Sequence, residues 1–226
     1  MADMAQSAHL PALVHQFETK EQQHEAGNLG MWVFLVTEIM FFGGAFMAYI
    51  VYRALHLESF ITGSHMLDVT FGATNTAVLI CSSLTMALAI HAAQTGKSKS
   101  TIITYLILTM ILGAAFLGIK FTFEWRHDWV EGLVPGLHFT YNGAHAPGVE
   151  MFFCFYFFMT GLHALHMIIG LGILTTLTVM ASRGRFNADY YAPLEVSGLY
   201  WHFVDIVWIF LFPLLYLIGG RYGGGH

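Results

Sequence analysis

Long apolar stretches recur along the chain, and short polar connections separate them. A stretch of about 20 predominantly apolar residues is long enough to cross a bilayer as a helix. The stretches that reach this length are 31–52, 73–93, 101–119, 151–181 and 199–220. Backbone groups in lipid must be hydrogen-bonded within their own segment, and the strict apolar/polar alternation typical of membrane barrels is absent. The pattern therefore predicts an all-α bundle of five transmembrane helices.

The segments outside these stretches divide the chain into three parts. Residues 1–29 are polar and rich in Gln, Glu and His, and we interpret them as an N-terminal cytoplasmic tail. Residues 30–220 form the predicted five-helix domain, and residues 221–226 a short C-terminal tail. The longest connection, 120–150, is predicted to be an aromatic loop at the level of the lipid headgroups, where Trp side chains concentrate.

Basic residues near the spans predict the orientation, because Lys and Arg are enriched in short cytoplasmic loops. The two short connections on the N-terminal side carry Lys97, Lys99, Arg183 and Arg185. We therefore expect the N-terminus in the cytoplasm and the C-terminus outside. Lys120 and Arg126 are counted as loop charges on the opposite side.

Composition excludes most soluble classes of protein. Hydrophobic residues make up 56% of the 226 residues and charged residues only 10%, whereas soluble domains carry about 25% charged residues. A net charge of −5 with nine Lys and Arg excludes a nucleic-acid partner bound by a basic patch. Cys81 and Cys154 are too few for a disulfide scaffold and show no Cys-x-x-Cys spacing. What remains is a polytopic membrane protein.

One carboxyl lies deep within the first span. Glu38 is eight residues past Gly30, which places it about 12 Å along a helix. A charge at the helix centre costs about 2.5–3.5 kcal/mol, so we expect this carboxyl to be protonated. Its helix face, with Ala45 and Tyr49, is expected to be covered by protein. The residues leave two interpretations open: a structural carboxyl bonded to a neighbouring helix, or a proton-linked or regulatory site.

Histidines form a second group of intramembrane polar residues. The fourth span carries His163 and His166 three residues apart, the fifth carries His202 and Asp205, and His91 ends the second. Haem would need axial ligands on facing helices. Matched polar sets on successive helices are more typical of interhelical hydrogen bonds. We therefore predict that these groups join the fourth and fifth helices and form no metal site.

Small residues also recur within the spans and are predicted to let helices approach closely. They are Gly43, Gly44, Gly113, Gly118, Gly170 and Gly172. No phosphate-binding glycine loop, Gly-x-Ser-x-Gly elbow or His-Glu-x-x-His motif is present in the sequence. We therefore expect no catalytic residue in this chain.

Three motifs in order resemble subunit III of haem–copper cytochrome c oxidases. Residues 200–208 read YWHFVDIVW and resemble the family's YWHFVDxVW signature. Residues 157–166, followed by Gly170, are similar to its TGxHxxHxxxG segment, and residues 37–43 to its SEvxFFxxF segment. Asn75-Thr76 and the ending at Glu124 are similar to further family positions. With five spans, the chain resembles the short bacterial form, which lacks the first two helices of the seven-helix form.

The resemblance implies an integral subunit without haem or copper of its own. The metals would lie in subunits I and II, which reduce oxygen with electrons from cytochrome c and pump protons in aerobic respiration. Subunit III would lie in the bacterial cytoplasmic membrane, pack on subunit I, bind phospholipid and support proton uptake. Glu38 matches the family's carbodiimide-reactive carboxyl. We predict structural or lipid-associated roles for the remaining polar positions, which are His91, Glu124, His163, His166, Glu195, Trp201, His202 and Asp205.

Other functions remain open on the sequence. Subunit III of a quinol oxidase and the accessory subunit of nitric oxide reductase would share this fold with a different partner. A haem b anchor would use two of the histidines, and a small proton-coupled transporter would use Glu38. The oxidase could also associate with other respiratory complexes.

Overall fold

The computed structural model describes residues 19–136, 138–186 and 190–218, and the regular elements of this part of the chain are helices. Five of them are long and apolar enough to cross a membrane, counting the short helices that extend α4 as part of one span. They are α1 (Lys20–Leu55), α3 (Val69–Gln94), α4 (Lys99–Ile119), α6 (Ala146–Ser182) and α7 (Ala192–Tyr216). The predicted all-α bundle of five transmembrane helices is confirmed.

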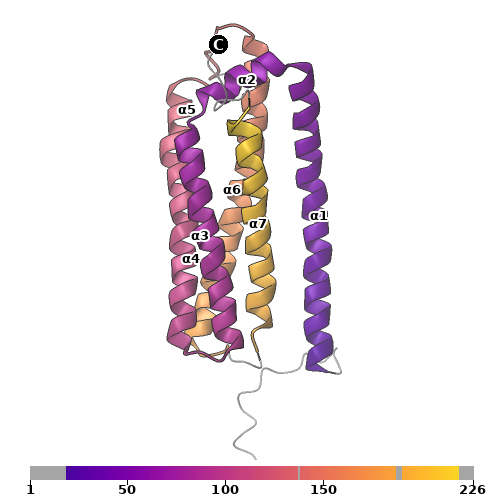
Figure 1. Cartoon of the computed structure of the whole chain (residues 1–226), viewed down its shortest axis with the longest axis vertical. Coiled ribbons are helices and arrows are strands. Elements are labelled where there is room, and N and C mark those ends of the chain that lie inside the picture. The colour runs from indigo at the N-terminus through magenta and orange to yellow at the C-terminus, as the bar shows by residue number, and fades with distance from the viewer. Residues whose placement is uncertain (1–18, 137, 187–189, 219–226) are drawn as a thin grey trace, which may run out of the picture.

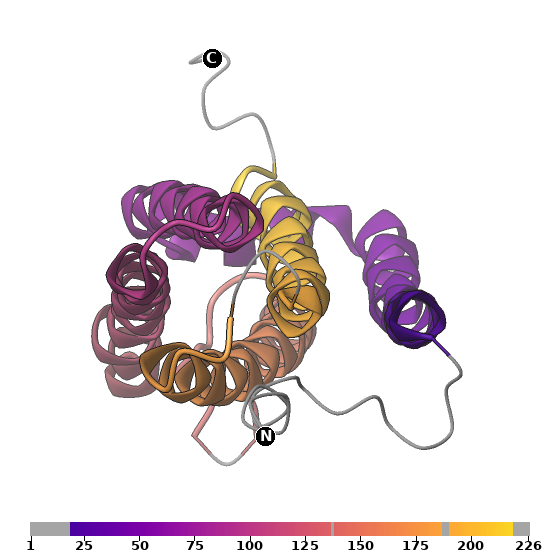
Figure 2. The same ribbon diagram turned by 90° about the horizontal axis from the view of Figure 1, so that it is seen from below.

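Four of the long helices form the main bundle, and the fifth stands beside it. Figure 1 shows α3, α4, α6 and α7 running side by side, with α1 separated from most of them. The view from below in Figure 2 shows α1 next to α7, the helix with which it makes most of its contacts. The short helix α2 (Leu57–Met66) crosses one end of the bundle from α1 to α3 and packs on α6. We call this end the α2 end.

Local sequence signals start several of these helices. The side chains of Thr19, Asp68 and Ser98 accept hydrogen bonds from the free backbone N–H groups at the starts of α1, α3 and α4. Helix α1 therefore begins at Lys20, within the segment interpreted as a polar tail, because its Lys, Glu and Gln residues favour a helix. Residues 1–18 and the segment 221–226 lie outside the described residues.

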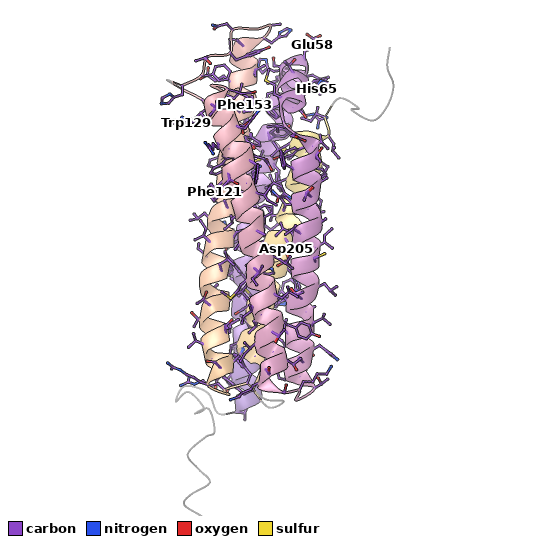
Figure 3. All side chains as sticks on the ribbon, turned by 90° about the vertical axis from the view of Figure 1, so that its left-hand side faces the viewer. Glu58, His65, Phe121, Trp129, Phe153 and Asp205 are labelled. Carbon is purple, nitrogen blue, oxygen red and sulfur yellow. The ribbon has the colours of Figure 1, made fainter. Side chains whose placement is uncertain are left out.

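The predicted loop at 120–150 is wrong in its first part. After α4 the chain continues without a break through a π-helical turn, η1 (Lys120–Trp125), and a short helix, α5 (Arg126–Val130). Lys120, counted from the sequence as a loop charge, is only 1% exposed. Trp129 is exposed near the α2 end, as Figure 3 shows, whereas Trp125 packs against Phe121 and Phe157. The apolar run ends at residue 119, but the helix does not, because buried polar residues extend it.

Trp201 occupies the centre of the main bundle. Its indole Nε1 donates a hydrogen bond to Ser82 Oγ on α3 at 3.1 Å. Its ring also lies against two glycines: a Cβ atom placed at Gly113 or at Gly170 would come within 2.8 Å of the indole. These two glycines therefore give α4 and α6 the room to close around one ring of α7. A Cβ atom placed at Gly43, Gly44, Gly118 or Gly172 would meet no described atom within 4 Å, so no helix of this chain makes the predicted close approach there.

A matched pair of glycine substitutions tests this packing. Gly170→Ala should destabilise the subunit by about 1–3 kcal/mol, because the trapped indole cannot move away from the added methyl group. Gly172→Ala, two residues along the same helix, meets no atom within 4 Å and should leave stability unchanged or slightly raised. Thermal dissociation of the subunit from its purified complex measures both. Equal midpoints for the two variants would contradict the packing described for Trp201.

Candidate functional site

A buried ionic cluster lies where η1 meets α3, α6 and α7, near the α2 end. We call it the Lys120 cluster, and it comprises Lys120, Glu124, Asn75, Tyr156 and Tyr216. The Lys120 Nζ atom lies 2.5 Å from Glu124 Oε2 and donates hydrogen bonds to Tyr216 Oη at 2.6 Å and Tyr156 Oη at 3.1 Å. The three acceptors match the three hydrogens of an ammonium group. The cation is therefore fully paired inside the bundle.

The carboxylate of this pair is equally well occupied. Glu124 Oε2 accepts hydrogen bonds from the hydroxyls of Tyr156 and Tyr216, and Oε1 lies 3.4 Å from the amide nitrogen of Asn75. The Trp208 ring centroid lies 5.1 Å from Lys120 Nζ, in the range of a cation–π contact. Buried charges persist in proteins when they are paired and hydrogen-bonded in this way. The cluster ties one helical turn to three transmembrane helices.

Lys120 and Glu124 face the same side because of the local helix geometry. An α-helix has 3.6 residues per turn, so residues four positions apart point in slightly different directions around the helix axis. The π-helical turn of η1 has more residues per turn and reduces this angular offset. As a result Lys120, Glu124 and Asp128, which are spaced four residues apart, all face the inside of the bundle and are buried. Glu124 was among the polar positions predicted from the sequence, whereas Lys120 was predicted only as a loop charge. The four-residue spacing of a Lys and two acids was the available signal.

A second polar pair joins α1 to α6. Glu38 Oε2 lies 3.2 Å from His166 Nε2, and His166 Nδ1 lies 2.9 Å from the backbone carbonyl oxygen of Leu162. A carbonyl oxygen only accepts, so Nδ1 carries a hydrogen and Nε2 is the atom that faces the carboxyl. The pair then holds one shared proton, as a carboxylic acid beside a neutral imidazole or as a carboxylate beside an imidazolium. This contact is the neighbouring-helix bond that was one of the two interpretations of Glu38.

The face of α1 that carries Glu38 is partly covered by the chain itself. Tyr49 is fully buried and donates a hydrogen bond from its hydroxyl to the carbonyl oxygen of Leu214 on α7, at 2.8 Å. Phe42 packs against His166 and Phe203. The Glu38 side chain keeps 19% of its surface exposed. The outward surface of α1 is apolar, with Trp32, Val36, Met40, Met47 and Ile50 exposed.

The polar residues of α6 and α7 do not form the predicted set of mutual bonds. His202 Nδ1 lies 2.6 Å from Ser83 Oγ on α3, and the carboxyl of Glu195 accepts a hydrogen bond from Gln94 at the end of α3. His166 bonds to α1, and the link from α7 to α6 is the Tyr200 hydroxyl, which donates to the His166 backbone carbonyl at 3.0 Å. The prediction is wrong because α7 lies in contact with α1, α3 and α6 together, so its polar groups have several neighbours.

Three of the positions predicted from the sequence are not joined to α1, α6 or a neighbouring helix by bonds of the kind that His166, His202 and Glu195 make. His91 is exposed near the end of α3. His163 and Asp205 are buried; among the described residues the His163 ring nitrogens have no hydrogen-bond partner, and Ser83 is the hydroxyl that interacts with the Asp205 carboxyl. The His163 ring lies between Phe116 and Trp208, whereas Asp205 lies at mid-height in the bundle (Figure 3). Within residues 19–136, 138–186 and 190–218, no group of three or more His, Cys, Asp or Glu side chains is placed to hold a metal ion.

Comparisons with known proteins agree with this architecture. The family model described as cytochrome c oxidase subunit III matches residues 14–220. Quinol oxidase subunit 3 of Bacillus subtilis is 30% identical over 202 residues, which cover 88% of this chain and 92% of the relative. Cytochrome bo(3) ubiquinol oxidase subunit 3 of Pseudomonas aeruginosa is 31% identical over 205 residues, covering 88% and 90%. The chain therefore belongs to the subunit III family of haem–copper oxidases.

Proposed function

We propose that this chain is the non-redox subunit III of a terminal haem–copper oxidase in a bacterial cytoplasmic membrane. It packs on subunit I and holds no haem or copper, which subunits I and II carry. The observation that carries this proposal is the use of its buried polar groups. Buried Lys120 and Glu124 and partly buried Glu38 and His202 each bond to a neighbouring helix of the same chain, as expected of a subunit whose role is structural.

The outward surface of α1 supports contact with subunit I and with phospholipid. This surface is long and apolar, and it is not covered by the other helices of the chain. A helix with such a surface is stable only in lipid or against another protein. Glu38 lies near the edge of this surface with its shared proton, so the Glu38–His166 pair supports a proton-linked role beside subunit I.

The orientation that we propose places the N-terminus in the cytoplasm and the α2 end outside. Lys97, Lys99, Arg183 and Arg185 lie at the end of the bundle opposite α2, where basic residues favour the cytoplasmic side. Lys120 does not count as a basic residue favouring the opposite orientation, because its charge is paired with Glu124 within the bundle.

Two electron donors are supported by different observations. The YWHFVDIVW signature resembles subunit III of cytochrome c oxidases, which favours cytochrome c. The relatives from Bacillus subtilis, Pseudomonas aeruginosa and Staphylococcus haemolyticus are all named as quinol oxidase subunits, which favours quinol as a second candidate. The donor is bound by other subunits, so this chain is compatible with either.

Purification through an affinity tag on this chain tests the proposal. We expect subunits I and II to co-purify, and the purified complex to consume oxygen with either reduced cytochrome c or a quinol. Stripping this chain from the complex with a stronger detergent should leave the ratio of haem and copper to subunit I unchanged. A haem or a copper ion that leaves together with this chain would overturn the proposal.

A further inference from the structure

A cavity of about 90 Å³, lined by both apolar and ionisable residues, opens at the α2 end, next to the Lys120 cluster. Its rim includes Asp68, Phe123 and His127, which are exposed. Its inner wall includes Glu124, Asp128 and Tyr156, which are buried. The cavity therefore leads from the surface to carboxyl groups inside the bundle.

Asp128 is the unexplained member of this wall. This residue is only 3% exposed, and its Oδ2 atom is buried without a hydrogen-bond partner among the residues that the structure describes. A buried polar atom left unpaired costs about 1–3 kcal/mol, and more when the group is charged. The Tyr156 hydroxyl also interacts with the Asp128 carboxyl but is shared with the Lys120–Glu124 pair. Because the cavity reaches Asp128, it can supply a further partner to this carboxyl.

The charges around Asp128 show what that partner must provide. Lys120 is the ammonium group of this region, and Glu124 already pairs with it. On the rim, His127 lies 3.2 Å from Glu131 and is largely exposed, and the Asp68 carboxyl caps α3. Tyr156 and Tyr216 are engaged with the Lys120–Glu124 pair. An ionised Asp128 would leave the buried group with one more carboxylate than ammonium.

The cavity has the size and the lining to hold water. A water molecule needs about 10–15 Å³ of probe-occupied volume and two to four polar partners. The cavity exceeds this size several times, and its lining includes the polar residues Asp68, Glu124, Asp128 and Tyr156. Hydrogen bonds through such waters can connect Asp128 to the exposed rim. These side chains do not form a group placed to coordinate a metal ion within the described residues, which favours a proton over a bound cation.

We propose that the cavity is a hydrated proton-exchange site in which Asp128 takes up and releases a proton with the aqueous phase at the α2 end. The proton on Asp128 balances the second carboxyl beside the Lys120 cluster, and water fills the path to the rim. Exchange moves one proton between the Asp128 carboxyl and water, without any other change in bonding. This site is distinct from the Glu38–His166 pair, which joins α1 and α6.

Infrared spectroscopy of the purified oxidase complex tests the proposal. The difference between wild type and Asp128→Asn should show loss of one carboxylic-acid C=O band. In the wild-type complex that band should shift as soon as H₂O is replaced by D₂O, and it should lose intensity as the pH is raised. Asp128→Glu, which keeps a carboxyl group in the cavity, should retain an acid band at a shifted position and provides the test if the Asn variant fails to assemble.

Asp205→Asn is the matched control. Its carboxyl is buried to the same degree but lies at mid-height in the bundle, away from the cavity (Figure 3). The acid band that this substitution removes should shift later in D₂O than the Asp128 band. A D₂O shift of the Asp128 band no faster than that of Asp205 would overturn the proposal. So would an Asp128 carboxyl that is ionised at every pH tested, with a sodium or magnesium ion retained at one per complex.

Discussion

Replacing Lys120 with Met should destabilise the subunit by about 3–5 kcal/mol, because Glu124 would be left as an uncompensated buried charge. Lys120 is 1% exposed and Glu124 6% exposed, and water in the neighbouring cavity could hydrogen-bond to Glu124 but could not neutralise its charge. The tyrosine hydroxyls would remain, but they cannot neutralise a carboxylate. The measurement is the fraction of this subunit retained in the purified complex as temperature rises, compared with wild type.

The double variant Lys120→Met/Glu124→Gln separates the ion pair from simple packing. It removes both charges and keeps similar side-chain volume, and replacing a whole buried pair is often close to neutral. We expect it to retain much more subunit than Lys120→Met alone. If the single and double variants lost the subunit equally, the buried charge would not be the cause.

Replacing Glu38 with Lys should greatly reduce assembly of the oxidase, whereas Glu38→Gln should assemble and still reduce oxygen. Gln keeps the shape and can donate a hydrogen bond to His166 Nε2, 3.2 Å from the present carboxyl oxygen. Lys places an unpaired cation beside the same imidazole, and an insertion cost of about 2.5–3.5 kcal/mol applies to a charge at the centre of a span. Because no redox group is proposed in this chain, losing the carboxyl should not stop oxygen reduction.

Oxygen consumption and subunit content of membranes carrying each variant measure this effect, together with labelling by carbodiimide, which the Gln variant should lose. Glu58→Lys is the matched control, since Glu58 is on α2 with its side chain 81% exposed, and its charge reversal should be tolerated. A Glu38→Gln complex that assembles fully but consumes no oxygen would show that Glu38 is essential to the chemistry.

The glycines and histidines include residues that are alike in the sequence but have different neighbours in the structure. Gly170 and Gly172 are equivalent in the sequence, since both are glycines in one apolar run. They differ in the structure because the ring of Trp201, which is 31 residues further along the chain, covers only Gly170. Likewise, the spacing of His163 and His166 shows that both belong to one helix, but not that only His166 reaches Glu38 on α1.

The sequence by itself determined the all-α class, the five spans, the family and the existence of buried polar positions, because these depend on local hydrophobicity and on residue order. Only the tertiary structure decided that the chain stays helical past residue 119 through η1 and α5, that Lys120 pairs inside the bundle, and which helix each polar residue meets. Hydrophobicity marks a residue as favourable or costly in lipid, whatever its neighbours are. Lys120 is buried with a carboxylate from its own helical turn and with two tyrosines and a Trp ring from other helices, and the approach of those three rings is a property of the packed bundle.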